Sequence, residues 1–305
     1  MKIIVVGLPL FAKKLVSDLN EYSQKKEYIF LDTYYSKWAQ LKFLLLLPFV
    51  DGVFSMNGVS DNSGTLNWVL FFKKKLWLQW VGTDTLLAAK RFNEKTILRK
   101  YIDYVHTKNV TDAPWLQTEL KTADIQAELN NYKYLPQQFD VPENYDKVAV
   151  LTYIAQKRQV FYGMKQLIDL AIQNPEIDFH IIGTHTSDFD APKNVICYGW
   201  VTENVAFEMM QKYPVFLRLT EHDGFSLSVV EAFSLGCEVV SSNAFPYANY
   251  TTHSNYREVF KQAVENVEKR GLKPNMEAMN FYRKKYDKAN VMKQLHNELK
   301  EYFGK

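Results

Sequence analysis

The stretch PVFLRLTEHDGFSLSVVEAFSLGCEVVSS, residues 214–242, decides the fold. It joins a short apolar run with one arginine to a polar turn around Gly224, and then to an apolar helical pattern that stops at Gly236. Buried strands of parallel sheets have nearly continuous apolar runs, and glycine is preferred just after a helix. The stretch therefore predicts a strand over 214–219, a helix over 226–235 and another strand after Gly236.

Two carboxylates flank the start of this predicted helix, with seven residues between them. Asp223 lies at the mouth of the helix and Glu231 about two turns along it. Ligands of open α/β sheets bind at the carboxyl ends of strands, where helix amides attract anions, and Gly224 would let a ligand approach the backbone. The pair predicts two contacts with one elongated, hydroxyl-rich ligand. The alternative is that Asp223 only caps the helix and Glu231 is an unrelated surface residue.

The same alternation of strand and helix runs through the chain. Further strands are predicted over 2–7, 75–82, 147–154 and 178–183, and a helix over 161–173. Such alternation predicts an α/β fold with parallel sheets and crossover helices. A length of 305 residues fits two domains, and residues 134–147 are rich in proline and polar residues. We predict domains over 1–140 and 141–285, with a final helix over 286–305 that could pack across both.

Composition is that of a globular protein, with 47% hydrophobic and 23% charged residues. The net charge is +3, but residues 1–100 hold 15 Lys and Arg against 8 Asp and Glu. Cys197 and Cys237 form neither a disulfide framework nor a metal-ligand spacing, which favours a reducing cytoplasm. The longest apolar run, residues 43–50, is far shorter than the roughly 20 residues of a membrane-spanning helix.

The segment around Asp223, Gly224, Phe225, Glu231 and Ala232 resembles the acidic signature of family 4 retaining glycosyltransferases, which have the GT-B fold. The resemblance covers most of residues 147–242. It implies two facing Rossmann-like domains with an interdomain cleft, a nucleotide-sugar donor, retention of anomeric configuration, and neither metal nor cofactor.

The resemblance also implies roles for individual residues. Asp223 would contact the donor sugar, Glu231 the ribose hydroxyls, and the backbone of Gly224, Phe225 and Ser226 the sugar and diphosphate. The first acid of the signature is commonly Glu, so the shorter Asp223 could need help from His222.

A second departure concerns the diphosphate. The family usually has an Arg and, five residues later, a Lys before a glycine, but Tyr162 stands in the Lys position before Gly163. Three other cations could take this role: Lys157, Arg158 and Arg218. Because an arginine in a buried strand needs an anion, Arg218 is expected to meet Asp223, Glu231 or a ligand phosphate.

Weaker signals complete the predicted site. Gly183 and Thr184 follow a strand and suit a nucleotide-facing loop, although many such turns contain glycine. Thr83 and Asp84 follow another strand and could line the cleft on the acceptor or donor side, or simply start a helix. The Asp188 and Asp190 pair resembles the metal-binding pair of other transferases, but its polar, proline-flanked setting favours a turn.

These observations predict a cytoplasmic glycosyltransferase with a lipid-linked, glycan or other acceptor bound by the N-terminal domain. The alternatives are a sugar-nucleotide epimerase, a phosphorylase, or a degenerate transferase that binds a sugar nucleotide without turnover. Residues 34–50 and 71–80 mix aromatic and aliphatic residues with lysines, so peripheral contact with an anionic membrane through Lys73, Lys74 and Lys75 is a further hypothesis. Trp77 and Trp80 would take no part if they fill the core. No nucleic-acid partner is predicted.

Overall fold

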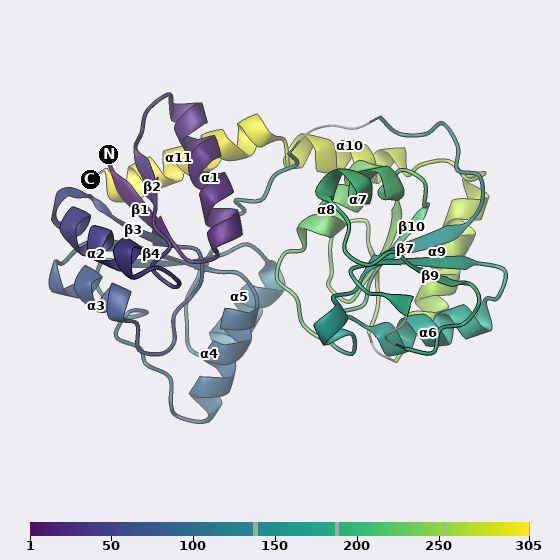
Figure 1. Cartoon of the computed structure of the whole chain (residues 1–305), viewed down its shortest axis with the longest axis horizontal. Coiled ribbons are helices and arrows are strands. Elements are labelled where there is room, and N and C mark those ends of the chain that lie inside the picture. The colour runs from purple at the N-terminus through teal and green to yellow at the C-terminus, as the bar shows by residue number, and fades with distance from the viewer. Residues whose placement is uncertain (137–139, 187–188, 253, 305) are drawn as a thin grey trace. The chain divides into compact units, whose positions relative to one another are not determined.

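A computed structural model of the chain describes residues 1–136, 140–186, 189–252 and 254–304. Its internal contacts divide the chain into two compact units (Figure 1). Unit 1 comprises residues 1–133 and 288–305, and unit 2 comprises residues 134–287. The change of unit at 133 precedes the predicted boundary at 140, and the final helix, predicted to pack across both domains, is grouped with unit 1.

Unit 1 is built around a parallel sheet. In the described residues, its strands lie in the order β2-β1-β3-β4-β5-β6, and each pairs with its neighbour in parallel. The elements are β1 (Ile3–Val6), α1 (Pro9–Ser23), β2 (Tyr28–Phe30), α2 (Lys37–Leu46), the 3-10 helix η1 (Leu47–Phe49), β3 (Gly52–Ser55), α3 (Gly64–Phe71), β4 (Lys75–Trp80), α4 (Thr83–Asn93), β5 (Thr107–Thr111), α5 (Pro114–Thr122), β6 (Glu128–Leu129) and α11 (Lys288–Phe303).

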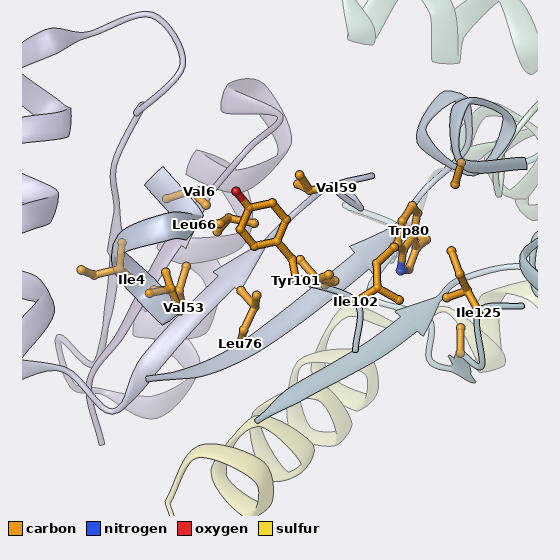
Figure 2. Packing of buried hydrophobic residues seen from close by; sticks show 14 of the residues in the cluster. Ile4, Val6, Val53, Val59, Leu66, Leu76, Trp80, Tyr101, Ile102 and Ile125 are labelled. Carbon is orange, nitrogen blue, oxygen red and sulfur yellow. The ribbon is translucent and has the colours of Figure 1, made fainter. Parts of the chain in front are cut away.

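The core of unit 1 forms where apolar side chains of neighbouring strands share one face of the sheet. Ile4 pairs with Val53 and Val53 with Leu76, and all three are fully buried. Figure 2 shows these side chains in a row across neighbouring strands, in one cluster with Tyr101, and Trp80 further along β4. Because side chains alternate along a strand, Trp77 belongs to the opposite face, where its ring meets that of Tyr302 on α11 at 5.8 Å.

Helix α11 completes unit 1 from the far end of the chain. The hydroxyl of Tyr28 lies 2.8 Å from Nδ1 of His296, and Lys288 lies 2.7 Å from Asp18 on α1. The Tyr302 hydroxyl donates to the carbonyl oxygen of His106 at 2.6 Å. These contacts attach the helix to α1, to β2 and to the segment before β5.

Unit 2 repeats the parallel α/β arrangement. In the described residues, its strands lie in the order β12-β11-β10-β7-β8-β9, again in parallel pairs. The elements are β7 (Ala149–Tyr153), the 3-10 helix η2 (Gln156–Arg158), α6 (Met164–Gln173), β8 (Asp178–Ile182), β9 (Val195–Cys197), α7 (Glu203–Met210), β10 (Val215–Arg218), α8 (Leu227–Ser234), β11 (Glu238–Ser241), β12 (Asn249–Tyr250), α9 (Tyr256–Lys269) and α10 (Met276–Lys285).

The predicted α/β fold with two parallel sheets is confirmed. The five strands for which the sequence predicted a range correspond to β1, β4, β7, β8 and β10. The helix predicted over 226–235 corresponds to α8. Among the described residues, no helix is both long and apolar enough to span a membrane. The apolar run at 43–50 instead forms the end of α2 and η1.

Candidate functional site

The candidate site lies at the carboxyl edge of the unit 2 sheet. Strand β10 sits between β7 and β11, so its end is flanked on both sides. Arg218, the last residue of β10, pairs with Ser241 of β11, while Leu217 pairs with Thr152 of β7. Parallel strands all end at one edge, so the loops after β7, β8, β10 and β11 converge there.

An ion pair occupies the loop after β10. Nε and a terminal nitrogen of Arg218 lie 2.7 and 2.6 Å from the same oxygen, Oδ2 of Asp223. The Arg218 side chain is only 9% exposed and that of Asp223 is 20% exposed. A buried guanidinium without an anion would be costly, so the carboxylate compensates its charge. Of the three anions predicted for Arg218, the structure places Asp223 beside it.

Two tyrosine rings border the same guanidinium. Its central carbon lies 4.9 Å from the ring centroid of Tyr162 and 5.9 Å from that of Tyr153. The two rings meet edge to face at 5.6 Å. Burial raises the pKa of Tyr153, so its hydroxyl stays protonated at neutral pH. Tyr162, which replaces the lysine of the family pattern, thus stacks against a cation supplied by β10.

Gly163 explains how Tyr162 reaches this position. Its φ is +79°, and a Cβ there would lie 2.3 Å from the carbonyl oxygen of Leu219. The amide of Glu221 also donates to the carbonyl oxygen of Phe161 at 2.9 Å. The loop before α6 therefore packs directly on the loop after β10, and only glycine fits at the closest approach.

The other two predicted cations, Lys157 and Arg158, lie in η2, in the same loop as Tyr162. Both side chains are exposed. The guanidinium carbon of Arg158 lies 3.8 Å from the ring centroid of Phe161. Arg158 is therefore held at the surface of the loop, whereas Arg218 is buried at the sheet edge.

Gly183 and Thr184 shape the edge at the end of β8. Gly183 has a φ of +95°, and a Cβ there would lie 2.6 Å from the carbonyl oxygen of Ile154. Thr184 is fully buried, and its hydroxyl donates to that same oxygen at 2.7 Å. The Thr184 side chain thus joins the ends of β7 and β8, and its carbonyl oxygen accepts the amide of Gly199 at 2.9 Å.

Helix α8 begins at the site. Ser226 is its N-cap residue, but its hydroxyl lies 2.9 Å from that of Ser228 and makes no side-chain cap. The Phe225 ring packs against Phe245 and Tyr286 at 5.1 and 5.5 Å. The Phe225 side chain therefore anchors the loop, and its role as a backbone contact for a ligand stays a prediction.

Glu231 and His222 are both partly buried. Glu231 is the fifth residue of α8, about 6 Å along the helix axis from its start, which is little more than one turn instead of the predicted two. His222 directly precedes Asp223 in the loop after β10.

Sequence reasoning missed two other groups of this edge. Tyr153 ends β7 beside Arg218, and the hydroxyl of Ser242 donates to the carbonyl oxygen of Thr220 at 2.7 Å. The signal for Ser242 was present, because polar residues directly follow the predicted strand after Gly236.

In unit 1, the Asp84 carboxylate is occupied by hydrogen bonds from backbone amides of two loops. Its carboxylate accepts N–H groups from Gly58 at 2.6 Å, from Gly82 at 2.8 Å and from Thr85 at 3.1 Å. Burial raises its pKa, and these hydrogen bonds oppose that rise. The carboxylate therefore joins the loops after β3 and β4, and of the predicted pair only Thr83 is exposed.

A second buried carboxylate follows the neighbouring strand. Asp112, directly after β5, has a fully buried side chain that lies 3.0 Å from Nζ of Lys133. Burial raises the pKa of Asp112 to about 6; Lys133 opposes the rise and Asp84 adds to it. Unit 1 thus carries a buried Asp–Lys pair at the carboxyl edge of its sheet.

A metal site has no support in the described ranges, where no group of three or more His, Cys, Asp or Glu could hold an ion. Of the predicted turn pair, Asp190 is exposed and Asp188 lies outside the described residues.

No protein-family model and no curated protein sequence matches the chain. Solved structures do match. Sucrose-phosphate synthase from Thermosynechococcus elongatus has a TM-score of 0.67 at 10% identity, with 100% of each chain covered. The lipopolysaccharide outer core galactosyltransferase WaaB has a TM-score of 0.64 at 13% identity, with 97% of this chain and 98% of that one covered. The chain has the GT-B fold.

A third GT-B structure was determined with ligands. The pneumococcal O-GlcNAc transferase GtfA, in complex with UDP and GlcNAc, matches 89% of this chain with a TM-score of 0.59 at 12% identity. The present chain spans 61% of the length of that protein. Identities this low show the fold alone, so the family 4 resemblance and its acid spacing stay predictions.

Proposed function

We propose that this GT-B protein is a glycosyltransferase that moves a sugar from a nucleotide-sugar donor to a hydroxyl of a lipid-linked, glycan or other acceptor, with retention of configuration and without a metal. The observation that carries the proposal is the gathering of Arg218, Asp223 and the start of α8 at one edge of the unit 2 sheet. Cations and helix amides there suit a diphosphate, and carboxylates suit sugar hydroxyls.

The proposed roles divide along the site. The backbone of Gly224, Phe225 and Ser226 would hold the sugar and diphosphate, with Arg218 as the leading cation. Lys157 and Arg158 remain alternatives for that cation. As the bond between the sugar and the diphosphate breaks, negative charge builds on the departing phosphate, and fixed amides and a guanidinium would stabilise it without reorganisation.

The carboxylates would recognise the two ends of the donor. Asp223 would contact the sugar, with His222 beside it, and Glu231 would accept hydrogen bonds from the ribose hydroxyls. Gly183 would contribute backbone contacts on the nucleotide side. The support for this arrangement is positional: these residues follow β8 and β10 or lie on α8, which begins at the same edge.

Acceptor, location and membrane contact complete the proposal. Unit 1 would bind the acceptor, and both cysteines are free thiols, which suits the cytoplasm. WaaB is a lipopolysaccharide outer core galactosyltransferase, which supports a lipid-linked acceptor as one class to test. Unit 1 would also make peripheral contact with an anionic membrane.

The decisive experiment compares Glu231→Gln with the parent by calorimetric titration of UDP, GDP and ADP. The variant keeps the shape of the side chain but loses charge-assisted hydrogen bonds, so the dissociation constant of the preferred nucleotide should rise about tenfold or more. Glu221→Gln, at an exposed position before Asp223, is the matched control and should bind like the parent. An unchanged affinity for Glu231→Gln would refute the ribose contact.

Turnover then separates the alternatives. Incubation with UDP-, GDP- and ADP-sugars should give transfer or slow donor hydrolysis if the protein is a transferase. Conversion of the donor sugar into an epimer would favour an epimerase, and nucleotide binding without any turnover would favour a degenerate transferase.

A further inference from the structure

One strip of the solvent-facing side of α2 is apolar. Trp38, Leu41 and Leu45 lie on it at intervals of three and four residues, with Tyr34 in the turn before α2 and Phe49 in η1 after it. These side chains are between 48% and 82% exposed. The opposite side of the helix faces the core through Phe43 and Leu47, which are buried. Folding of unit 1 therefore accounts for one apolar face of α2 but not for the other.

Helix α3 extends this apolar face. Phe71 is 71% exposed, and its ring meets that of Trp68 at 5.6 Å. The two helices are neighbours in Figure 1, and Leu41 of α2 and Trp68 of α3 line one cavity of about 680 Å³. The α2–α3 surface is defined by the exposed side chains of Tyr34, Tyr35, Trp38, Leu41, Leu45, Phe49, Trp68 and Phe71.

The charge of the surrounding segments has one sign. Residues 33–50 and 63–75 contain five lysines and neither Asp nor Glu. Lys37, Lys42 and Lys73 are exposed.

Three acids border these segments. Asp32 accepts the amide of Tyr35 at 3.1 Å, and Asp51 accepts that of Lys2 at 2.6 Å. Asp61, which lines the cavity between α2 and α3, pairs with Arg91 at 2.7 Å.

Two of the three lysines predicted to contact a membrane form hydrogen bonds to backbone carbonyl oxygens within unit 1 instead. Lys74 donates to the carbonyl oxygens of Pro48 and Val50 at 2.9 and 2.8 Å. Lys75 donates to the carbonyl oxygen of Tyr302 at 2.8 Å. Only Lys73 of that run is exposed, so the basic character of the surface comes from it together with α2.

The two tryptophans of β4 are also excluded from contact with a membrane. Trp77 and Trp80 are fully buried and cannot reach a lipid. The exposed aromatic side chains of this region belong to the turn before α2, to α2, to η1 and to α3.

We propose that the α2–α3 surface docks unit 1 onto an anionic lipid bilayer. Tryptophan and tyrosine favour the boundary between headgroups and acyl chains, and leucine and phenylalanine favour its apolar side. Lysines at the rim of such a patch are attracted by anionic headgroups. A contiguous exposed apolar patch marks an interaction site, and a rim of exposed lysines whose neighbouring acids are hydrogen-bonded or ion-paired favours an anionic occupant.

The proposal deepens the membrane contact of the proposed function and rests on it for its biological purpose. Its test does not depend on catalysis, because nucleotide binding by unit 2 can be measured separately. A protein that binds nucleotide but no vesicle would contradict only the docking proposal.

The test is co-sedimentation of the full chain with vesicles of phosphatidylcholine alone or mixed with phosphatidylglycerol. The parent should bind the mixed vesicles at low salt and lose most of this binding in high salt. The triple variant Trp38→Gln, Phe49→Gln, Phe71→Gln should bind these vesicles more weakly by a factor of about ten or more. Its matched control, Val105→Gln, Val160→Gln, Trp200→Gln, changes side chains that are 74–83% exposed elsewhere and should bind like the parent.

A second pair of variants tests the charge. The triple variant Lys37→Ser, Lys42→Ser, Lys73→Ser should bind the mixed vesicles more weakly by a factor of about ten or more, because three attractions to headgroups are removed. Lys193→Ser, Lys212→Ser, Lys261→Ser, at exposed positions of unit 2, should bind normally. Unaltered circular dichroism and nucleotide affinity would show that each variant is folded.

Three results would overturn the proposal. The first is no binding of the parent to mixed vesicles at low salt. The second is unchanged binding by either test variant. The third is a concentration-dependent dimer in ultracentrifugation that the aromatic variant abolishes while vesicle binding persists, since the surface would then serve a second copy of the chain.

Discussion

Arg218 and Asp223 share a single oxygen, because two guanidinium nitrogens lie 2.7 and 2.6 Å from the same Oδ2. The two residues were predicted separately, one for the diphosphate and the other for the donor sugar. Their pairing means that neither would be an independent contact for the proposed donor before it binds. A donor phosphate would compete with the Asp223 carboxylate for the guanidinium.

This competition gives the first prediction, for Asp223→Asn. The amide keeps the size of the side chain but no longer holds the guanidinium by charge, so a nucleoside diphosphate should bind severalfold more tightly, while sugar transfer falls by about 10- to 100-fold. Calorimetry and transfer assays measure the two effects. Asp169→Asn, which breaks the more exposed pair with Arg257 in the same unit, is the control. Weaker diphosphate binding by Asp223→Asn would argue against Arg218 as the diphosphate cation.

The second prediction concerns the ring beneath that guanidinium. Tyr162→Ala should weaken diphosphate binding by about three- to tenfold, because a cation–π contact and its packing are lost, whereas Tyr162→Phe should bind nearly as the parent does. Affinities from fluorescence or calorimetric titration decide this.

Phe161→Ala is the informative counterpart, because Phe161 supports Arg158 rather than Arg218. A larger loss for Phe161→Ala than for Tyr162→Ala would transfer the diphosphate role to Arg158.

The third prediction concerns metal. If amides and basic side chains hold the diphosphate, activity in excess EDTA should stay within about twofold of its value without EDTA. A metal-dependent transferase assayed in parallel verifies the chelation. Loss of activity that manganese restores would contradict the proposed mechanism and direct attention to Asp188 and Asp190.

The fourth prediction is a pH dependence of stability. A carboxyl whose pKa rises from an ordinary 3.8 to about 6 on folding is most favourable to the fold when protonated, so its contribution is present below pH 4 and is lost as pH rises through 6. Asp112→Asn cannot ionise and so does not lose this contribution. The difference in unfolding free energy between the variant and the parent should therefore shift in favour of the variant by about 3 kcal/mol between pH 4 and pH 7.

Urea denaturation followed by tryptophan fluorescence measures this change in unit 1, which holds five of the six tryptophans. Asp103→Asn, at an exposed position, should show the pH trend of the parent. A parallel trend for Asp112→Asn would mean that the Asp112 pKa is not raised.

The strands that the sequence predicted are those with long apolar runs. Strands β1, β4, β7, β8 and β10 are inside their sheets and read as near-continuous apolar segments. The edge strands β2, β6, β9 and β12 are only two or three residues long, too short for any periodicity.

The candidate site was predictable where it is local. Asp223 was one of the anions expected beside Arg218, because an arginine in a buried strand needs an anion and Asp223 lies five positions further along, across one turn. The backbone path of that turn determines which anion lies beside Arg218. The sequence alone left three possible anions: Asp223, Glu231 and a ligand phosphate. The engagement of Asp84 by the amide of Gly58, 26 residues earlier, depends on two loops meeting in space.

Helix α11 has a consequence for the order in which the units are completed during synthesis. Unit 2 is finished once residue 287 has left the ribosome, whereas unit 1 still lacks the helix that covers Trp77 and contacts Tyr28. Domains generally fold in the order of their synthesis. Here the unit begun first must wait for residues 288–303, with one flank of its sheet open to chaperones or to aggregation until they emerge.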